Sequence, residues 1–177
     1  PVQGYGAAMR RGLREAQGDL VAVCEPDGTF CPNDLHKLAA YSDDFDYVIG
    51  TRTTREMVWE GANMGVALKW GNWVMAKMAE FLFNCTLLTD CGCTFRLIRR
   101  RALAAIEPCF RSTGSAFGLE MTLWVIRKRL PFVEIPVNYR ARVGVSAVTG
   151  RLDKTVALAL EMGAMIWRHR LGLERLR

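Results

Sequence analysis

The spacing of hydrophobic and polar residues alternates along the chain between a helical period and short, unbroken apolar runs. Apolar residues recur at helical spacing from Tyr5 to Ala16. The next run, "LVAVCE", is apolar up to its last residue, which is typical of a strand buried on both faces of a parallel sheet. A second helix is expected to begin near Pro32, ahead of the strand-like run "DYVIGTR". This order predicts an α/β fold with a mainly parallel sheet.

The second half of the chain continues this alternation with longer helices. The expected elements are a helix over 63–84, the short apolar run "FRLI", a helix from about Arg100, a helix over 117–129 and the strand-like run "FVEIPVNYR". Pro136 lies inside the last run, which favours an edge strand or a bend. We expect residues 1–150 to form one body and residues 151–177 to form an amphipathic helix.

Length and composition favour a single cytosolic domain. The 177 residues, half of them hydrophobic, can bury one sizeable core. The longest apolar run near the C-terminus contains Glu161 and has about 12 residues, whereas a membrane-spanning helix needs about 20. The first residues lack the apolar core of a secretory signal. The six cysteines are expected to be reduced, and the pair Cys91 and Cys93 lacks the further ligands of a zinc site.

The net charge of +6 hides a local asymmetry. Residues 19–46 contain seven acidic residues and a single lysine, so the remainder of the chain is strongly basic. A basic protein with one acidic segment favours an anionic ligand that a metal bridges to the acidic residues. Charge alone also fits nucleic acid or an anionic lipid surface as the partner.

Two carboxylates close the first predicted strand. Glu25 and Asp27 follow its apolar residues, separated by Pro26. Ligands of an open parallel sheet bind beyond the carboxyl ends of its strands, and residues two apart in extended backbone point the same way. The pair can therefore share one hard cation. The alternative is a plain turn, since Pro-Asp-Gly suits turn geometry.

Three further stretches place charged groups near the same expected edge. Arg52 follows the next strand, where a guanidinium can clamp a phosphate, although a solvated surface arginine also fits. Asp90 lies in a loop, where it can present a carboxylate to a substrate or cap a neighbouring turn. Arg140, Arg142 and Ser146 lie in a glycine-bearing segment, which suits either a loop that closes over phosphates or a basic surface loop.

Five stretches follow one another along nearly the whole chain. They are "GYGAAMRRGLREAQGDLVAVCEPDGTFCPNDL", "DYVIGTR", "LKWGNWVMAKM", "LLTDCGCTFRLIRR" and "PVNYRARVGVSAVTG". In this order they resemble glycosyltransferase family 2, and within it bacterial enzymes similar to dolichyl-phosphate mannosyltransferase. The resemblance implies a GT-A fold, which is Rossmann-like, an inverting transfer, a nucleotide-diphosphate sugar donor and a divalent metal, Mg²⁺ or Mn²⁺.

The resemblance also implies which residues serve the donor. Glu25 and Asp27 fall on the family's D-x-D-type metal motif, with Glu in the first position. Arg142 and Ser146 fall on the loop that faces the donor diphosphate. A metal and an arginine at these positions would stabilise the charge that develops on the departing nucleotide diphosphate.

On the acceptor side, Arg52 and Lys69 match basic contacts to an acceptor phosphate, and Asp90 matches a base or an acceptor-positioning residue. Glu120 matches an acidic position of a helix that lines the cleft. A lipid phosphate is largely dianionic at neutral pH and needs no strong base. Asp90 would matter more if the acceptor were a sugar hydroxyl, which must lose a proton.

The leading expectation is transfer of a sugar from a UDP- or GDP-sugar to a polyprenyl (dolichyl or undecaprenyl) phosphate, by a cytoplasmic enzyme peripheral on the inner face of the membrane. The basic clusters "RLIRRR" and "RKR" suit an anionic membrane. The terminal helix either lies in the membrane interface, with Trp167 facing the lipid, or packs on the body.

Two other functions remain open. A family 2 enzyme can act on a hydroxyl of a glycan or small acceptor, and a non-catalytic basic module can bind membrane or nucleic acid. The carboxylates clustered at a strand end argue against nucleic acid.

The resemblance further implies that a segment with the first two strands of the sheet precedes Tyr5 in similar enzymes. We therefore expect residues 1–150 to be the C-terminal portion of a GT-A catalytic domain. We expect the 177-residue chain to lack much of the nucleotide pocket and to present an unpaired apolar edge at "LVAVCE".

Overall fold

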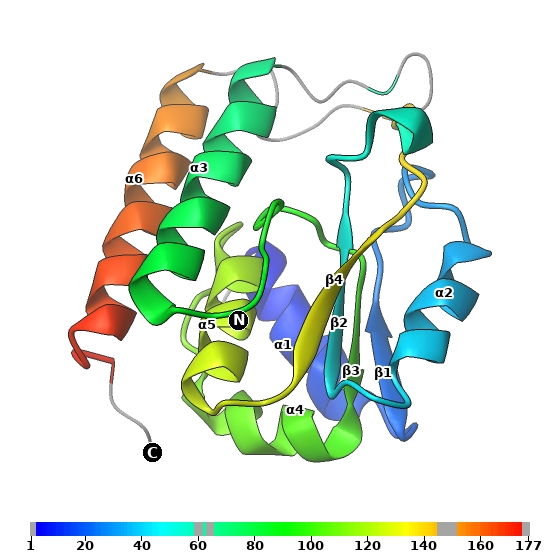
Figure 1. The fold of residues 1–177 in the computed structure, drawn as a ribbon, viewed down its shortest axis with the longest axis horizontal. Helices are drawn as coiled ribbons and strands as arrows, with labels where there is room; N and C mark the ends of the chain where they lie inside the picture. Colours follow the sequence, from blue (N-terminus) through cyan, green and yellow to red (C-terminus); the bar gives the residue numbers. More distant parts are fainter. Residues whose placement is uncertain (1–2, 59–61, 63–65, 145–151, 175–177) are drawn as a thin grey trace.

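The computed structural model describes residues 3–58, 62, 66–144 and 152–174. Within these ranges the chain forms a four-stranded sheet flanked by helices (Figure 1). The elements are, in order, α1 (Tyr5–Glu15), β1 (Leu20–Val23), α2 (Asp34–Tyr41), β2 (Tyr47–Thr51), the 3₁₀ turn η1 (Arg55–Met57), α3 (Val66–Phe83), β3 (Arg96–Arg99), α4 (Arg100–Ile106), η2 (Glu107–Cys109), α5 (Phe117–Arg127), β4 (Phe132–Pro136) and α6 (Leu152–Arg170).

The sheet is mixed, with strand order β1-β3-β2-β4. β2 and β4 pair in parallel, whereas β3 is antiparallel to both β1 and β2. The α/β prediction is confirmed, and β1, β2 and β4 run in one direction, but β1 and β2 are not neighbours. The reversed strand between them is the run "FRLI", whose few apolar residues carry no sign of strand direction. β4 is an edge strand of the sheet, as Pro136 predicts.

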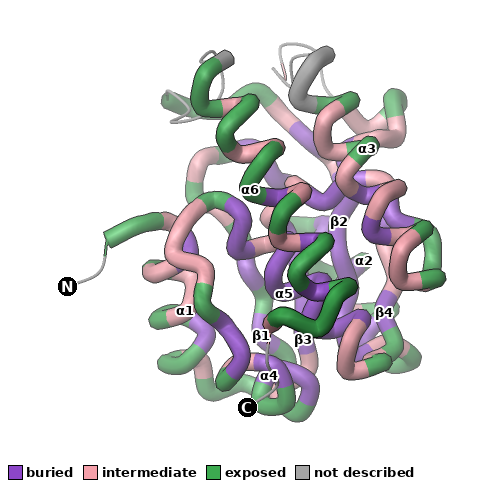
Figure 2. Tube along the Cα trace, turned by 90° about the vertical axis from the view of Figure 1, so that its left-hand side faces the viewer, coloured by how far each residue is buried: buried purple, intermediate pink, exposed green. Residues whose placement is uncertain are grey.

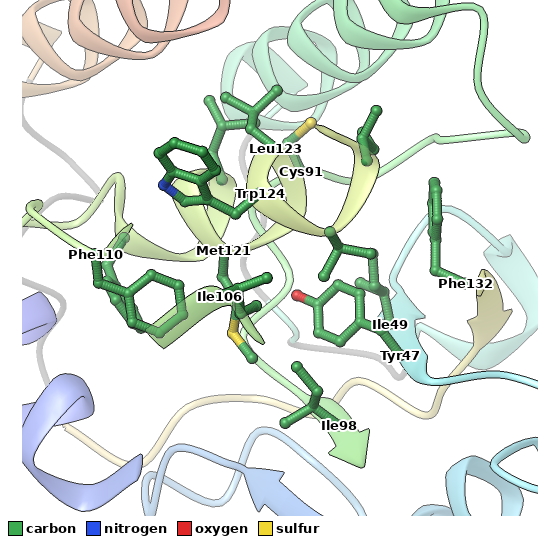
Figure 3. Close-up of a cluster of buried hydrophobic side chains, with 14 of the residues drawn as sticks. Tyr47, Ile49, Cys91, Ile98, Ile106, Phe110, Met121, Leu123, Trp124 and Phe132 are labelled. Carbon is green, nitrogen blue, oxygen red and sulfur yellow. The ribbon is translucent and has the colours of Figure 1, made fainter. Parts of the chain in front are cut away.

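β2 is one of the two inner strands, and its side chains point alternately into two cores. Tyr47 and Ile49 belong to the larger core, which Figure 3 shows between the sheet, α4 and α5. Val48 belongs to the smaller core on the other face of the sheet, with Leu38 of α2. All five residues of β2 are buried, as expected for a strand covered on both sides.

β1 differs from this expectation. Val21 and Val23 are buried, but Leu20 and Ala22 are exposed, so the prediction that the strand is buried on both faces is wrong for this chain. β1 is an outer strand of the sheet that the described residues form, and packing covers only one of its faces.

α6 packs on the body of the protein. It lies beside α3 and also contacts α5, with Met162, Ile166 and His169 buried at the junction (Figure 2). The His169 ring meets the Trp124 ring edge-on, with 4.8 Å between ring centroids. The terminal helix thus packs on the body, while Trp167 on its outer side stays exposed. Among the helices within the described ranges, none is both long enough and apolar enough to cross a bilayer.

Candidate active site

Four chain segments meet at the carboxyl ends of β1 and β2. β3 begins there, because Arg96 pairs with Val23 on one side and Ile49 on the other. The segment after β4 joins them, since Tyr139 forms isolated bridges with the segments that follow β1 and β2. We call this edge the rim; it comprises residues 24–30, 52–58, 88–95 and 137–143. The rim brings together Glu25, Asp27, Arg52, Asp90 and Arg142, which the sequence singles out separately.

Arg142 binds both carboxylates that follow β1. Its Nη2 donates to Glu25 Oε2 at 3.1 Å and lies 2.9 Å from Asp27 Oδ2. The Val143 N–H also donates to the carbonyl oxygen of Asp27 at 2.9 Å. The loop after β4 is therefore fastened to the acidic turn by backbone and side chain together.

The pKa values of the two carboxylates shift in opposite directions. Burial raises the pKa of Glu25, and a hydrogen bond with Asp27 adds to this effect, against the opposing charge of Arg142. Burial also acts to raise the pKa of Asp27, but the Thr29 hydroxyl and N–H donate to its Oδ1 at 2.6 and 3.0 Å and hold its pKa below the usual range. Asp27 is therefore the more firmly ionised member of the pair.

The pair also fits a cation. Asp27 Oδ2 is shielded from solvent and accepts no hydrogen bond within the described part of the chain, where its contact is the ion pair with Arg142. A buried carboxylate oxygen that accepts no hydrogen bond, beside a second carboxylate, suits a hard cation. The described residues contain no group of three or more His, Cys, Asp or Glu side chains that could hold a metal. A cation at Asp27 would therefore complete its shell with water or with ligand oxygens.

Arg52 and Asp90 form one buried ion pair. Arg52 Nε donates to Asp90 Oδ2 at 2.7 Å and Nη2 donates to Oδ1 at 2.9 Å. The backbone N–H groups of Arg52 and Gly92 complete the set at 3.1 Å each. The side chains are 9% and 1% exposed, and the Arg52 guanidinium lies over the Tyr139 ring. Burial acts to raise the pKa of Asp90, but the charge and hydrogen bonds of Arg52 outweigh it and lower that pKa.

This geometry bears on the interpretations that the sequence leaves open for the two residues. A solvated surface arginine is wrong for Arg52, because the side chain is buried. Asp90 does cap a turn, through the N–H of Gly92, and at the same time holds Arg52. The pairing itself was not foreseen from the sequence.

Sequence reasoning also missed Glu134. Its Oε2 accepts hydrogen bonds from the N–H and the hydroxyl of Thr89, and its Oε1 accepts one from the N–H of Asp90. The Thr89 hydroxyl further meets those of Thr51 and Thr53 at 2.9 and 3.0 Å. The available signal was an acidic residue inside the otherwise apolar strand run "FVEIPV".

The remaining predicted residues stand apart from these two pairs. Lys69 is exposed on α3, and no described contact joins it to Arg52 or Asp90. Ser146 lies outside the described residues. Glu120 is buried in α5 and accepts the N–H groups of Arg111 and Ser112 at 2.8 and 2.9 Å. Neither partner belongs to the rim, so the Glu120 carboxylate holds a loop and does not face the rim, and the expected place of its helix along the cleft stays a prediction.

Comparison with curated proteins places similar sequences among sugar transferases. "Dolichyl-phosphate beta-glucosyltransferase" of Saccharomyces cerevisiae is 26% identical over 184 residues, covering 98% of this chain and 54% of that protein. "Low-salt glycan biosynthesis hexosyltransferase Agl6" of Haloferax volcanii is 27% identical over 144 residues, covering 80% of this chain and 34% of that protein. The chain thus spans about half or less of the length of these relatives.

Solved structures share the fold. Glucosyl-3-phosphoglycerate synthase from Mycobacterium tuberculosis, in complex with phosphoglyceric acid, aligns with a TM-score of 0.67 at 16% identity, covering 96% of this chain and 56% of that one. The same enzyme in complex with Mn²⁺, uridine diphosphate and glucosyl-3-phosphoglycerate aligns with a TM-score of 0.64 at 16% identity, covering 97% of this chain and 57% of that one. The chain therefore has a GT-A fold. The model of "Glycosyl transferase family 2" matches residues 2–106, which is more than half of the sequence, and the chain belongs to this family.

Proposed function

We propose that the protein carrying this chain transfers a sugar from a UDP- or GDP-linked donor to a polyprenyl phosphate, with inversion and with a divalent metal. The observation that carries the proposal is the buried Arg52–Asp90 pair at the same rim as Glu25 and Asp27. It presents a fixed guanidinium to a phosphate-bearing acceptor. The relative from Saccharomyces cerevisiae is named for dolichyl phosphate, and the solved neighbour is in complex with phosphoglyceric acid. Both names therefore include a phosphate-bearing compound.

On the donor side, Asp27 and Glu25 would hold Mg²⁺ or Mn²⁺, as the neighbour's complex with Mn²⁺ and uridine diphosphate supports. The bound metal would offset the negative charge that develops on the departing diphosphate. Arg142, which pairs with both carboxylates, is close enough to turn its guanidinium towards diphosphate oxygens and stabilise the same charge. Ser146 is proposed as a further diphosphate contact from the same loop.

On the acceptor side, Asp90 fixes Arg52 through Nε and Nη2, which leaves the Nη1 edge of the guanidinium for a phosphate oxygen. Lys69, exposed on α3, is proposed as a second cation for that phosphate. A phosphate dianion attacks without giving up a proton, so this reaction does not need Asp90 as a base.

Transfer to a sugar hydroxyl is the second candidate, and it would assign Asp90 as the base. The oxygens of Asp90 already accept four N–H groups, and its pKa is lowered. A carboxylate in this state is a weak proton acceptor. The geometry of Asp90 therefore favours an acceptor that is already ionised.

We also propose that the face formed by α3 and α6 lies on the anionic inner surface of the cytoplasmic membrane. α3 exposes Trp70, Trp73 and Phe81, while α6 exposes Leu160 and Trp167. Aromatic and apolar side chains of this kind enter the interfacial region of a bilayer, and the basic last turn of α6 suits anionic lipid headgroups.

The experiment that tests the reaction is a donor screen with radiolabelled UDP- and GDP-sugars, Mn²⁺ and two acceptors, a short polyprenyl phosphate and the corresponding polyprenol. We expect label in the lipid fraction with the phosphate alone. Transfer to polyprenol, or to added oligosaccharide in preference to the phosphate, would contradict the proposal.

A further inference from the structure

The loop that carries Asp90 has no strand pairing of its own, so its backbone polar groups need other partners. It leads from α3 into β3 and lies at the rim. Carboxylates accept its N–H groups in turn: Glu80 accepts that of Leu88 at 3.0 Å, and Asp90 itself accepts that of Gly92 at 3.1 Å. Between these two positions, Glu134 of β4 serves two consecutive residues of the loop.

Glu134 uses both of its oxygens. Oε2 accepts from the Thr89 N–H and hydroxyl at 2.7 Å each, and Oε1 accepts from the Asp90 N–H at 2.8 Å. Glu134 pairs in register with Ile49 of β2, the strand that runs directly into Arg52. The sheet therefore fixes the distance from the Glu134 carboxylate to both members of the Arg52–Asp90 pair.

Arg96 secures the far side of the same loop through its carbonyl oxygens. Nε donates to Cys93 O at 2.7 Å, and Nη2 donates to Cys91 O at 3.0 Å. Nη1 donates to the hydroxyls of Tyr47 and Thr122 at 2.7 and 3.1 Å. The loop is thus held between the Glu134 carboxylate, which accepts its N–H groups, and the Arg96 guanidinium, which donates to its carbonyl groups.

We propose that Glu134 is a positioning residue for the acceptor site: it sets the backbone of Thr89 and Asp90, and through Asp90 it sets the direction of the Arg52 guanidinium. The inference rests on the proposed function, in which Arg52 binds an acceptor phosphate. Glu134 touches neither Arg52 nor a substrate in this arrangement, so its effect passes through the Asp90 carboxylate.

Glu134→Gln separates positioning from general stability. An amide has a single acceptor oxygen, so whichever way it turns, its NH₂ group faces an N–H that Glu134 now accepts. Glu120→Gln is a matched control, because Glu120 is also a substantially buried glutamate that accepts two consecutive backbone N–H groups, on a loop outside the rim. Burial raises the pKa of both glutamates. Both variants should lose comparable thermal stability, and only one should disturb Arg52.

The first measurement is independent of activity. In protein labelled with ¹⁵N-arginine, the Nε–H signal of Arg52, identified by its loss in Arg52→Lys, should shift or broaden in Glu134→Gln and remain unchanged in Glu120→Gln. If Glu134→Gln does not fold, Glu134→Asp replaces it, because aspartate keeps the charge but is too short to accept from both Thr89 and Asp90. An unchanged Arg52 signal in a folded Glu134 variant would overturn the inference.

The second measurement is kinetic, in the full-length enzyme with a polyprenyl phosphate acceptor. Glu134→Gln should raise the acceptor KM about tenfold, the effect of one charge-assisted hydrogen bond, while the donor KM changes less than about twofold. Glu120→Gln should leave both constants within about twofold. Equal effects of the two variants would reject positioning. Absence of transfer by the unmodified enzyme would reject the proposed function instead, and the Arg52 signal would still decide the role of Glu134.

Discussion

Arg142 Nη2 lies 2.9 Å from Asp27 Oδ2, the buried carboxylate oxygen that accepts no hydrogen bond within the described residues. The arginine thus neutralises the position at which we propose that a metal binds. Since the same guanidinium also reaches Glu25, the loop after β4 would compete with that cation for the two carboxylates.

This competition gives the first prediction. Arg142→Ala should bind Mn²⁺ about two- to fivefold more tightly in the absence of nucleotide, because a partly exposed ion pair contributes up to about 1 kcal/mol. In the presence of uridine or guanosine diphosphate the same variant should bind the nucleotide more weakly, because it lacks a cation for the diphosphate. Titration calorimetry with Mn²⁺, with and without nucleotide, measures both. Weaker Mn²⁺ binding without nucleotide would show that Arg142 does not compete with the metal.

Asp27→Asn should lower transfer at least about 100-fold, because the residue whose pKa is depressed is the one that supplies a full negative charge. Glu25→Gln should cost less, because burial raises the pKa of Glu25 and so opposes its ionisation, whereas the pKa of Asp27 is lowered. Initial rates over a range of Mn²⁺ concentrations compare the two variants. Retained activity of Asp27→Asn at ordinary Mn²⁺ would remove Asp27 from the metal site.

Arg52→Ala should destabilise the protein by about 3 to 5 kcal/mol, because it leaves the Asp90 carboxylate buried without its partner. Arg52→Lys keeps the charge but loses the two-point contact with Asp90, and should weaken acceptor binding while donor binding stays nearly intact. Urea unfolding measures the first effect, and separate donor and acceptor binding assays measure the second. Equal weakening of both substrates by Arg52→Lys would assign Arg52 to the donor side.

A membrane contact through α3 and α6 predicts a change in vesicle binding. Replacing Trp70 and Trp167 together by Ala should reduce cosedimentation with vesicles that contain anionic lipid, because both side chains are exposed and available to the interface. Thermal unfolding of the variant should be nearly unchanged, since exposed residues contribute little to the core. The Tyr41→Ala variant, which removes an exposed aromatic side chain from α2, is the control. Unchanged cosedimentation of the double variant would contradict the membrane proposal.

The gathering of several predicted site residues at the rim could be predicted from the sequence because it depends on local order. Glu25, Asp27 and Arg52 each follow an apolar run, and the carboxyl ends of strands that run in one direction meet at one edge. The partners of these residues could not be predicted in the same way. Arg52 and Asp90 are 38 residues apart, and they meet only because β3 starts at the rim, running opposite to β1 and β2.

Glu134 shows the same limit. Its contact with Asp90 spans 44 residues and depends on the register of β4 against β2, which no local pattern specifies. The exposed face of β1 has a related cause. An apolar run indicates a strand, but which of its faces is covered depends on elements elsewhere in the fold.

The last prediction concerns the junction of α5 and α6. Burial, together with the nearby charge of Arg127, lowers the pKa of His169 from its ordinary value to about 4. The unfolded chain therefore binds a proton more readily than the folded one, so this contribution to stability is fully present above pH 6.5 and is lost as the pH falls from about 6.5 to about 4. The loss should reach about 2 to 3 kcal/mol at pH 4.5.

His169→Phe keeps a ring against Trp124 but cannot be protonated. The difference in unfolding free energy between the two proteins, measured in urea, should therefore shift towards the Phe variant between pH 7.5 and pH 4.5. A difference that stays constant over this range would mean that His169 is protonated as readily in the folded protein as in the unfolded chain.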